Sequence, residues 1–265
     1  MNVDFVALDL DGTLIGRDTR LSPRIRTCVA AVLSQGTAIC IVTGRMFRAA
    51  APFVRELGLR APTICYQGAW VVEGESGRRI LDRPIAAPLV EEILDEFNSE
   101  DLHLQLYADD RYYCERNNRF AELYASLAGV APIVAPMRER FAGRSATKAV
   151  VVSDPDIAAE VELRARRRCG ERLYITRSYP EFVEMLDPTV DKGSALAFVA
   201  ERSGIPMERV LAIGDSWNDL PMIERAGIGV AMGNAPVEVR ERADAVVGRV
   251  DEDGVCDALE RFVLR

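Results

Sequence analysis

Short apolar runs that alternate with helical periodicity, at both ends of the chain, constrain the fold more than any other feature of the sequence. Near the start of the chain these runs lie at residues 5–8, 38–42 and 63–66, and the residues between them have apolar positions at helical spacing. The rhythm returns after Pro188, with runs at 210–213, 228–231 and 245–247 and helices expected at 192–202, 218–226 and 236–243. Because this alternation favours right-handed βαβ units, we predict a parallel sheet.

The middle of the chain has a different texture. After a β-hairpin expected at residues 71–72 and 79–81, strands are expected at 102–107, 111–114, 146–152, 173–176 and 182–186, and helices at 89–97, 120–127 and 155–169. This order is typical of an α+β module with a mostly antiparallel sheet. The predicted fold class is therefore α/β, with a Rossmann-like doubly wound core formed by residues 1–82 and 188–265. Residues 83–187 are expected to form an inserted α+β domain.

Charge and apolar content exclude several classes of partner. A net charge of −8 and a pI near 5.0 argue against nucleic-acid binding, which needs a basic face. No apolar run is long enough to span a bilayer, and the first residues do not resemble a secretory signal. The six cysteines include no C-x-x-C pair and are interpreted as buried or incidental thiols. We therefore expect a cytoplasmic monomer or homodimer without a membrane partner.

Two acids follow the first predicted strand. Asp9 and Asp11 stand two residues apart at its carboxyl end, where open parallel sheets place their sites. Strand alternation would put both side chains on one side, and their mutual repulsion would favour a cation beside them. Carboxylate oxygens suit Mg²⁺, and Gly12 allows a sharp turn. Taken alone, the cluster would also suit an ordinary strand-to-turn junction.

Three further clusters follow in order along the chain. Thr43 and Gly44 end a predicted buried strand and can present a hydroxyl and a backbone N–H to a phosphate oxygen. Lys192 stands at the start of a predicted helix; of 33 basic residues, only it and Lys148 are lysines. Lys148 is interpreted as a surface or cap residue. The last cluster, residues 214–219, ends another strand in Asp215 and Asp219.

Together these clusters resemble the four motifs of the haloacid dehalogenase phosphatase superfamily. The Gly-Asp-x-x-Asn-Asp sequence at 214–219 and the large insert resemble its Cof-type branch, which has a class IIB cap. The resemblance implies that Asp9 is the nucleophile and that Asp11 protonates the leaving group and later activates water. It also implies a Mg²⁺ ion held by the Asp9 carboxylate, the Asp11 carbonyl and Asp215, with Asp219 positioning a water or Lys192.

The resemblance further implies a set of phosphate-binding residues, which are Thr43, Gly44, Lys192 and Asn218. The family often has Asn-Gly-Ala where this chain has Gln67-Gly68-Ala69, so the role of the Gln67 amide is left open. The inserted segment would be a cap that selects the leaving group, with candidate contacts from His103, Tyr107, Arg111, Tyr113 and Arg177. His103, the single histidine, is interpreted as a sheet-face residue, and no His/Cys spacing suits zinc.

The sequence thus predicts a Mg²⁺-dependent phosphatase that acts on a small phosphomonoester, a sugar phosphate or related metabolite, through an aspartyl-phosphate on Asp9. A phosphomutase of the same fold is one alternative, which would return the phosphoryl group to a sugar instead of to water. A phosphoryl-accepting signalling module is another, although it would need neither Asp11 nor residues 214–219. A third alternative, a binding protein without catalysis, is disfavoured because it would not require the acids, the hydroxyl and the lysine together.

Overall fold

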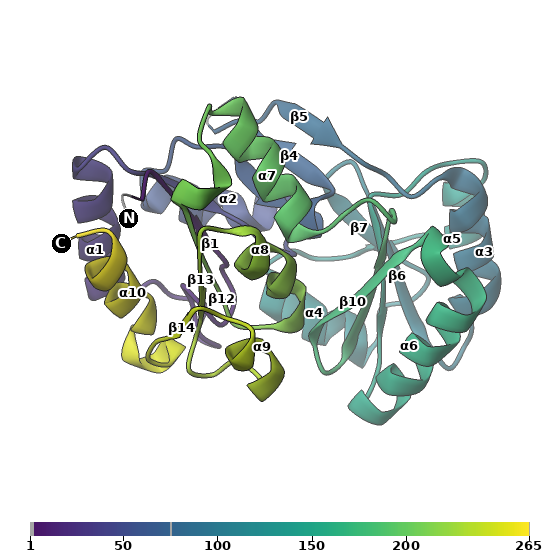
Figure 1. Cartoon of the computed structure of the whole chain (residues 1–265). Coiled ribbons are helices and arrows are strands. Elements are labelled where there is room, and N and C mark those ends of the chain that lie inside the picture. The colour runs from purple at the N-terminus through teal and green to yellow at the C-terminus, as the bar shows by residue number, and fades with distance from the viewer. Residues whose placement is uncertain (1–2, 75, 265) are drawn as a thin grey trace. The chain divides into compact units, whose positions relative to one another are not determined.

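The structure is a computed structural model that describes residues 3–74 and 76–264 (Figure 1). The chain divides into two compact units, which are called the first and second unit below. The first unit contains Met1–Leu81 and Asp191–Arg265, and the second contains Asp82–Val190. These boundaries lie one and three residues from those expected from the sequence, at 82/83 and 187/188.

The first unit is built on a five-stranded parallel sheet with the order β14-β13-β12-β1-β2. Its strands are β1 (Phe5–Leu8), β2 (Ala38–Ile41), β12 (Val210–Gly214), β13 (Ile228–Ala231) and β14 (Ala245–Val246). The chain leaves β1 towards β2 on one side and later returns to β12 on the other. This reversal of strand order beside β1 is the topological switch point of a doubly wound sheet, so the predicted fold class is confirmed.

Both faces of this sheet are covered by helices, which explains why its strands read as continuous apolar runs. Alternate residues of β1 point to opposite faces: Val6 packs with α1 (Pro23–Ser34) and α10 (Gly254–Phe262), and Ala7 with α7 (Lys192–Arg202). Ser22 begins α1 by accepting a hydrogen bond from the Ile25 backbone N–H at 3.1 Å. The remaining helices of this unit are α2 (Phe47–Glu56), α8 (Leu220–Arg225) and α9 (Val237–Glu241).

The third predicted strand departs from the predicted parallel arrangement. β3 (Thr63–Cys65) touches the parallel sheet through a single bridge, Ile64 to Val42, and otherwise pairs antiparallel with β4 (Trp70–Val72). The chain reverses here because Tyr66 and Gln67 take left-handed backbone conformations, with φ of 53° and 60°. The result is a separate sheet with the order β3-β4-β5, in which β5 is Arg79–Asp82.

The second unit contains a six-stranded sheet with the order β10-β11-β9-β6-β7-β8. All its neighbours are antiparallel except β7 and β8, so the predicted mostly antiparallel pairing is observed. Its strands are β6 (His103–Ala108), β7 (Arg111–Cys114), β8 (Ile133–Val134), β9 (Lys148–Val152), β10 (Tyr174–Tyr179) and β11 (Phe182–Leu186). One face packs on α3 (Ala87–Phe97), α5 (Met137–Phe141) and α6 (Pro155–Cys169).

The other face of this sheet is partly covered by α4 (Arg119–Ala128), whose Tyr124 contacts the rings of Tyr107 and Tyr112. The interpretation of Lys148 as a surface residue is wrong. Its side chain is buried, and its ammonium forms an ion pair at 3.0 Å with Glu184, which is also buried. All six cysteines are buried free thiols, and no described helix is long and apolar enough to cross a membrane.

Candidate active site

The predicted functional clusters meet at one edge of the parallel sheet. Asp9 directly follows β1, Asp215 directly follows β12, and Thr43 lies two residues beyond β2. The backbone N–H of Asp9 donates to the carbonyl of Ile213 at 3.0 Å, which continues the pairing of β1 with β12 up to the two acids. The carboxyl ends of these neighbouring strands therefore present the side chains at the switch point of the sheet.

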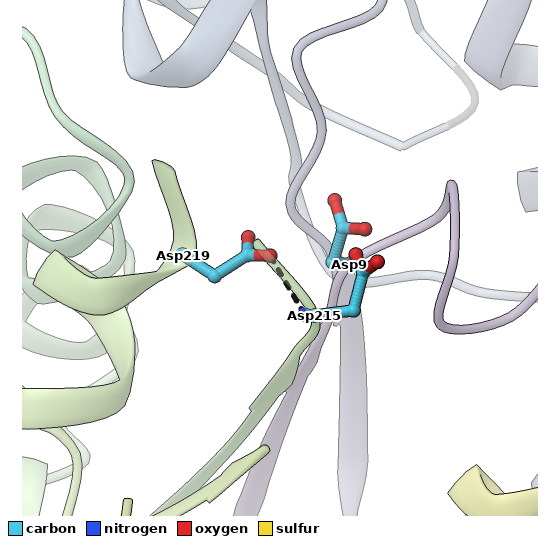
Figure 2. A group of neighbouring side chains, drawn as sticks. All are labelled: Asp9, Asp215 and Asp219. Carbon is cyan, nitrogen blue, oxygen red and sulfur yellow. Dashed lines mark hydrogen bonds between the residues drawn. The ribbon is translucent and has the colours of Figure 1, made fainter. Parts of the chain in front are cut away.

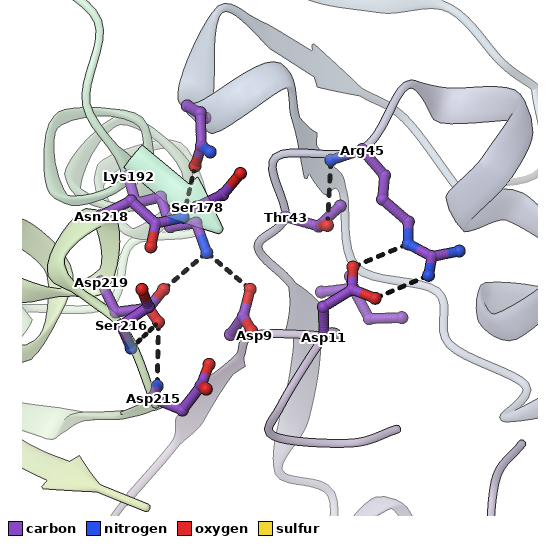
Figure 3. A network of polar contacts seen from close by, with 12 residues as sticks. Asp9, Asp11, Thr43, Arg45, Ser178, Lys192, Asp215, Ser216, Asn218 and Asp219 are labelled. Atoms are coloured by element: carbon purple, nitrogen blue, oxygen red, sulfur yellow. Dashed lines mark hydrogen bonds and ion pairs between the residues drawn. The ribbon is translucent and has the colours of Figure 1, made fainter. Parts of the chain in front are cut away.

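Lys192 joins this edge from the start of α7 (Figure 3). Its ammonium donates at 2.5 Å to Asp9 Oδ1 and at 2.5 Å to Asp219 Oδ1. Asp191 caps the helix by accepting from the Ser194 backbone N–H at 2.6 Å, which fixes Lys192 in the first turn. The side chains of Lys192 and Asp219 are 1% exposed and that of Asp9 is 6% exposed, so the cation is enclosed with both anions.

Asp219 also organises the turn that carries Asp215. Its Oδ2 accepts from the backbone N–H group of Asp215 at 2.9 Å (Figure 2) and from that of Ser216, also at 2.9 Å (Figure 3). A Cβ on Gly214 would lie 2.5 Å from the Cβ of Asp219, so this close approach requires glycine. With Oδ1 on Lys192 and Oδ2 on the turn, Asp219 links the lysine to the end of β12.

Three carboxylates crowd together beside Lys192. Asp9, Asp215 and Asp219 each offer an oxygen within 4.8 Å of the others. Burial, and next the charge of Asp219, raises the pKa of Asp9 well above its ordinary value, while Lys192 lowers it. The same two causes raise the pKa of Asp215 to about 8. Burial lowers the pKa of Lys192, but the charges of Asp219 and Asp9 outweigh it and raise that pKa.

Gly12 and Asn234 pack closely against the carboxylate of Asp215. Gly12 has a φ of 81°, and a Cβ there would lie 2.2 Å from Asp215 Oδ2. Asn234 donates from Nδ2 both to this oxygen at 3.1 Å and to the Gly12 carbonyl at 3.0 Å. The Asn234 Oδ1 accepts from the Val250 N–H at 2.9 Å, which fixes the orientation of the amide. Carboxylate oxygens, such as those of Asp9 and Asp215, are the kind of ligand that Mg²⁺ prefers.

Asp11 points away from the three carboxylates, towards Arg45 (Figure 3). The guanidinium of Arg45 donates from Nε to Asp11 Oδ2 at 2.7 Å and from Nη2 to Oδ1 at 2.6 Å. Strand alternation does not reach this residue, because β1 ends at Leu8 and the following residues turn. The bidentate pair therefore holds Asp11 in a position of its own beside the site.

The predicted phosphate-binding residues surround the same edge. Thr43 is buried, and its Oγ1 accepts from the Arg45 backbone N–H at 3.1 Å. Gly44 lies against the Gln67 amide, since a Cβ there would be 2.4 Å from Gln67 Nε2. Asn218 donates from Nδ2 to Gln67 Oε1 at 2.9 Å, and its buried Oδ1 has no hydrogen-bond partner among the described residues. An unsatisfied buried amide atom is costly and indicates a site for a ligand or water.

Sequence reasoning missed three residues that organise this site. Arg45 directly follows the Thr43-Gly44 pair, and that position was the available signal. Asn234 lies in the 229–235 segment, which has a glycine-rich pattern but no charge to single out the amide. Gln67 was left without a role, yet its amide contacts Asn218.

Comparisons with known proteins show similarity over nearly the whole chain. A model of the haloacid dehalogenase-like hydrolase family matches residues 6–259. The chain is 30% identical over 265 residues to a 5-amino-6-(5-phospho-D-ribitylamino)uracil phosphatase of Bacillus subtilis, covering 100% of this chain and 97% of that protein. It is 28% identical over 271 residues to a pyridoxal phosphate phosphatase of Escherichia coli, covering 99% and 98%.

Solved structures show that the fold is also shared over nearly the whole chain. A crystal structure from Thermotoga maritima has a TM-score of 0.84 and 32% identity, covering 98% of this chain and 97% of that one. The matches confirm the family resemblance predicted from the four motifs. They also confirm the predicted enzyme class, a phosphoric monoester hydrolase.

Proposed function

The chain belongs to the haloacid dehalogenase-like hydrolase family, and from this premise we propose that it is a Mg²⁺-dependent phosphatase acting through an aspartyl-phosphate on Asp9. The observation that carries the proposal is the contact of Asp9 with Lys192 at 2.5 Å. Both charged side chains are buried at the carboxyl end of β1. A carboxylate held beside an ammonium can approach an anionic phosphoryl group, because the ammonium offsets the repulsion between the two anions.

The donor set fits a divalent cation. Both oxygens of Asp219 are engaged, one with Lys192 and one with the backbone, so Asp9 and Asp215 are the carboxylates best placed to bind Mg²⁺. We include the Asp11 carbonyl as a third ligand. Mg²⁺ bound there would neutralise charge on the transferring phosphoryl oxygens and lower the raised pKa values of Asp9 and Asp215.

In the first half-reaction an oxygen of Asp9 attacks phosphorus, and the bond from phosphorus to the leaving oxygen breaks. Asp11 supplies the proton that this oxygen takes up, which gives a neutral alcohol. Lys192, Thr43, Gly44 and Asn218 bind the phosphoryl oxygens during the transfer. For this last role the Asn218 amide would turn over to present Nδ2, since its Oδ1 is an acceptor.

In the second half-reaction the Asp11 carboxylate takes a proton from water, whose oxygen attacks phosphorus. The bond from phosphorus to Asp9 breaks, inorganic phosphate leaves, and the Asp9 carboxylate is restored. Arg45 binds the ionised form of Asp11, which is the form that accepts this proton. The side chain must leave Arg45 and carry a proton before the next leaving group can be protonated.

For the substrate, we propose a small phosphorylated metabolite. Two relatives are named for phosphomonoesters of this kind, a ribitylaminouracil phosphate and pyridoxal phosphate. We further propose that the second unit acts as a cap that selects the organic part of the substrate. The net charge of −8 does not favour a nucleic-acid substrate, because binding to a phosphate backbone needs a positively charged surface.

The test is release of inorganic phosphate from p-nitrophenyl phosphate and a panel of phosphorylated metabolites, with Mg²⁺ and with EDTA. Repeated turnover that needs Mg²⁺ supports the proposal. Activity that depends on a sugar bisphosphate activator would instead indicate a phosphomutase. A stable phosphoprotein without turnover would indicate a signalling module, and either result would reject the proposed phosphatase.

A further inference from the structure

The buried side chain of Gln67 has no role in the chemistry proposed above. Gln67 lies in the tight turn Tyr66–Gly68 that follows β3, and its backbone takes a left-handed conformation with a φ of 60°. A residue with a long side chain rarely adopts this conformation, because its Cβ crowds the following carbonyl oxygen. Residues held in this way cluster at functional sites, where the surrounding structure keeps them in place. The turn thus places a fully buried primary amide inside the first unit.

The turn is fixed on two sides by segments that carry predicted phosphate-binding residues. The backbone N–H of Gln67 donates to the carbonyl of Thr43 at 3.1 Å. Gly68 lies against the start of α7, since a Cβ on this glycine would be 2.5 Å from the carbonyl oxygen of Asp191. Gln67 is therefore held between the loop that contains Thr43 and the helix that begins at Lys192.

The amide of Gln67 contacts two further residues of the phosphate-binding set. Its Oε1 accepts a hydrogen bond from Asn218 Nδ2 at 2.9 Å. Its Nε2 lies so close to Gly44 that a Cβ on that glycine would be 2.4 Å away. Asn218 is itself buried, and its Oδ1 has no hydrogen-bond partner among the described residues. The contact with Gln67 therefore determines which end of the Asn218 amide is left for a ligand.

The observed orientation of the Asn218 amide does not suit a phosphoryl ligand. Phosphoryl oxygens accept hydrogen bonds, whereas the end of the amide that is left over is the acceptor Oδ1. A half-turn of the Asn218 amide would present Nδ2 instead, but it would also place Oδ1 against Gln67 Oε1, and two acceptors repel each other. Glutamine can remove this conflict, because a half-turn of its own amide replaces Oε1 with the donor Nε2.

We propose that Gln67 is a positioning residue for phosphoryl transfer, and that its amide turns over together with the amide of Asn218. When a phosphoryl group binds, Gln67 Nε2 would donate to Asn218 Oδ1, and Asn218 Nδ2 would donate to a phosphoryl oxygen. Gln67 acts through Asn218 and does not contact the substrate itself. This role rests on the proposed phosphatase function, since it concerns the binding of the phosphoryl group that is transferred.

The experiment is a double-mutant cycle of Gln67→Met and Asn218→Ala. It measures kcat and KM for p-nitrophenyl phosphate and the inhibition constant Ki of inorganic phosphate. Methionine keeps the length of the Gln67 side chain but removes its amide, so Asn218 loses the partner that orients it. In Gln67→Met, KM and Ki should both rise about tenfold, because a hydrogen bond to a charged phosphoryl oxygen is weakened. The value of kcat should change less, since this bond forms with bound substrate as well as in the transition state.

The double variant separates positioning from a structural role. If Gln67 acts only through Asn218, the double variant should have the same kcat/KM as Asn218→Ala alone, because no amide remains to be oriented. A merely structural role predicts instead that the two losses multiply. The control is Thr37→Val, which removes another buried side-chain hydrogen bond of the first unit, from Thr37 Oγ1 to the Val3 carbonyl at 3.4 Å. Thr37 precedes β2 and so lies at the opposite end of that strand from Thr43, and KM and Ki should be unchanged.

Unchanged KM and Ki in Gln67→Met, or losses that multiply in the double variant, would overturn the positioning role and leave the phosphatase intact. Absence of phosphate release by the wild type from every ester would instead reject the phosphatase, and the positioning role with it. If Gln67→Met fails to fold, Gln67→Asn decides in its place. That variant keeps a buried amide but withdraws it from Asn218 by one methylene group, so it should also raise KM and Ki, and unchanged values would overturn the role.

Discussion

Replacing Lys192 with methionine should destabilise the protein and abolish turnover. The substitution keeps the length of the side chain but removes the cation bonded at 2.5 Å to both Asp9 and Asp219. Three carboxylates would then share the site without an ammonium, and the side chains of Asp9 and Asp219 are at most 6% exposed. Breaking a buried ion pair by removing one partner costs about 3–5 kcal/mol.

A loss of that size should lower the melting temperature by roughly 10 °C in a protein of this length. Turnover of p-nitrophenyl phosphate should fall by about 10³ or more, since the phosphoryl group loses a charged donor. Part of the lost stability should return at low pH, because protonated carboxylates no longer repel each other. Thermal unfolding in EDTA and steady-state phosphate release, each at several pH values, measure these effects.

The matched control is Arg24→Met. Arg24 also joins two carboxylates, Asp257 at 2.8 Å and Glu260 at 3.1 Å, but its side chain is 41% exposed. An exposed pair contributes at most about 1 kcal/mol, so this variant should unfold close to the wild type and keep its activity. If Lys192→Met were as stable and as active as Arg24→Met, the role assigned to the buried lysine would be wrong.

Two further results follow from the site. The raised pKa of Asp215, about 8, means that between about pH 4 and 8 the folded state holds a proton that the unfolded state has lost. In EDTA the free energy of unfolding should therefore fall as pH rises through this range, while the stabilisation by added Mg²⁺ should grow. Denaturant titrations measure both. A free energy of unfolding in EDTA that stays flat or rises with pH would contradict the raised pKa of Asp215. Gly12→Ala should lose most activity, because its Cβ would lie 2.2 Å from Asp215 Oδ2 and would displace that carboxylate. The positive φ at this position should also cost about 1–3 kcal/mol of stability through backbone strain. Gly36→Ala, with a similar φ of 87° but nothing within 4 Å of the added Cβ, should show the strain alone, and equal activities of the two variants would refute the close packing at Gly12.

The core sheet could be predicted because its strands are buried on both faces and read as apolar runs. Three of these runs, at 5–8, 38–42 and 210–213, ended in residues that can carry chemistry. Because parallel strands bring their carboxyl ends together, Asp9 and Asp215 could be placed at one site, and the family resemblance added Lys192. The C-terminal helix α10 was missed, although Val255, Cys256, Ala258 and Leu259 have helical spacing. That signal was present and was overlooked.

Other features leave no periodic signal in the sequence. The contact of Asp11 with Arg45 joins residues 34 positions apart and depends on side-chain geometry alone. Lys148 begins an apolar strand, where a single lysine resembles a solvated edge residue until Glu184 is found beside it. The reversal after β3 uses positive φ at Tyr66, Gln67 and Gly68, and of these only the glycine is a residue type that usually announces a turn.

The account depends most on Asp9 as the nucleophile, and the Asp11→Asn variant tests this directly. Asparagine cannot take a proton from water, so a phosphoryl group transferred from p-nitrophenyl phosphate in the presence of Mg²⁺ should accumulate on the enzyme. After an acid quench, peptide mass spectrometry should find that group on Asp9, and the double variant Asp9→Asn/Asp11→Asn should carry none. A phosphoryl group on another residue, or undiminished phosphate release by Asp9→Asn, would contradict the proposed chemistry.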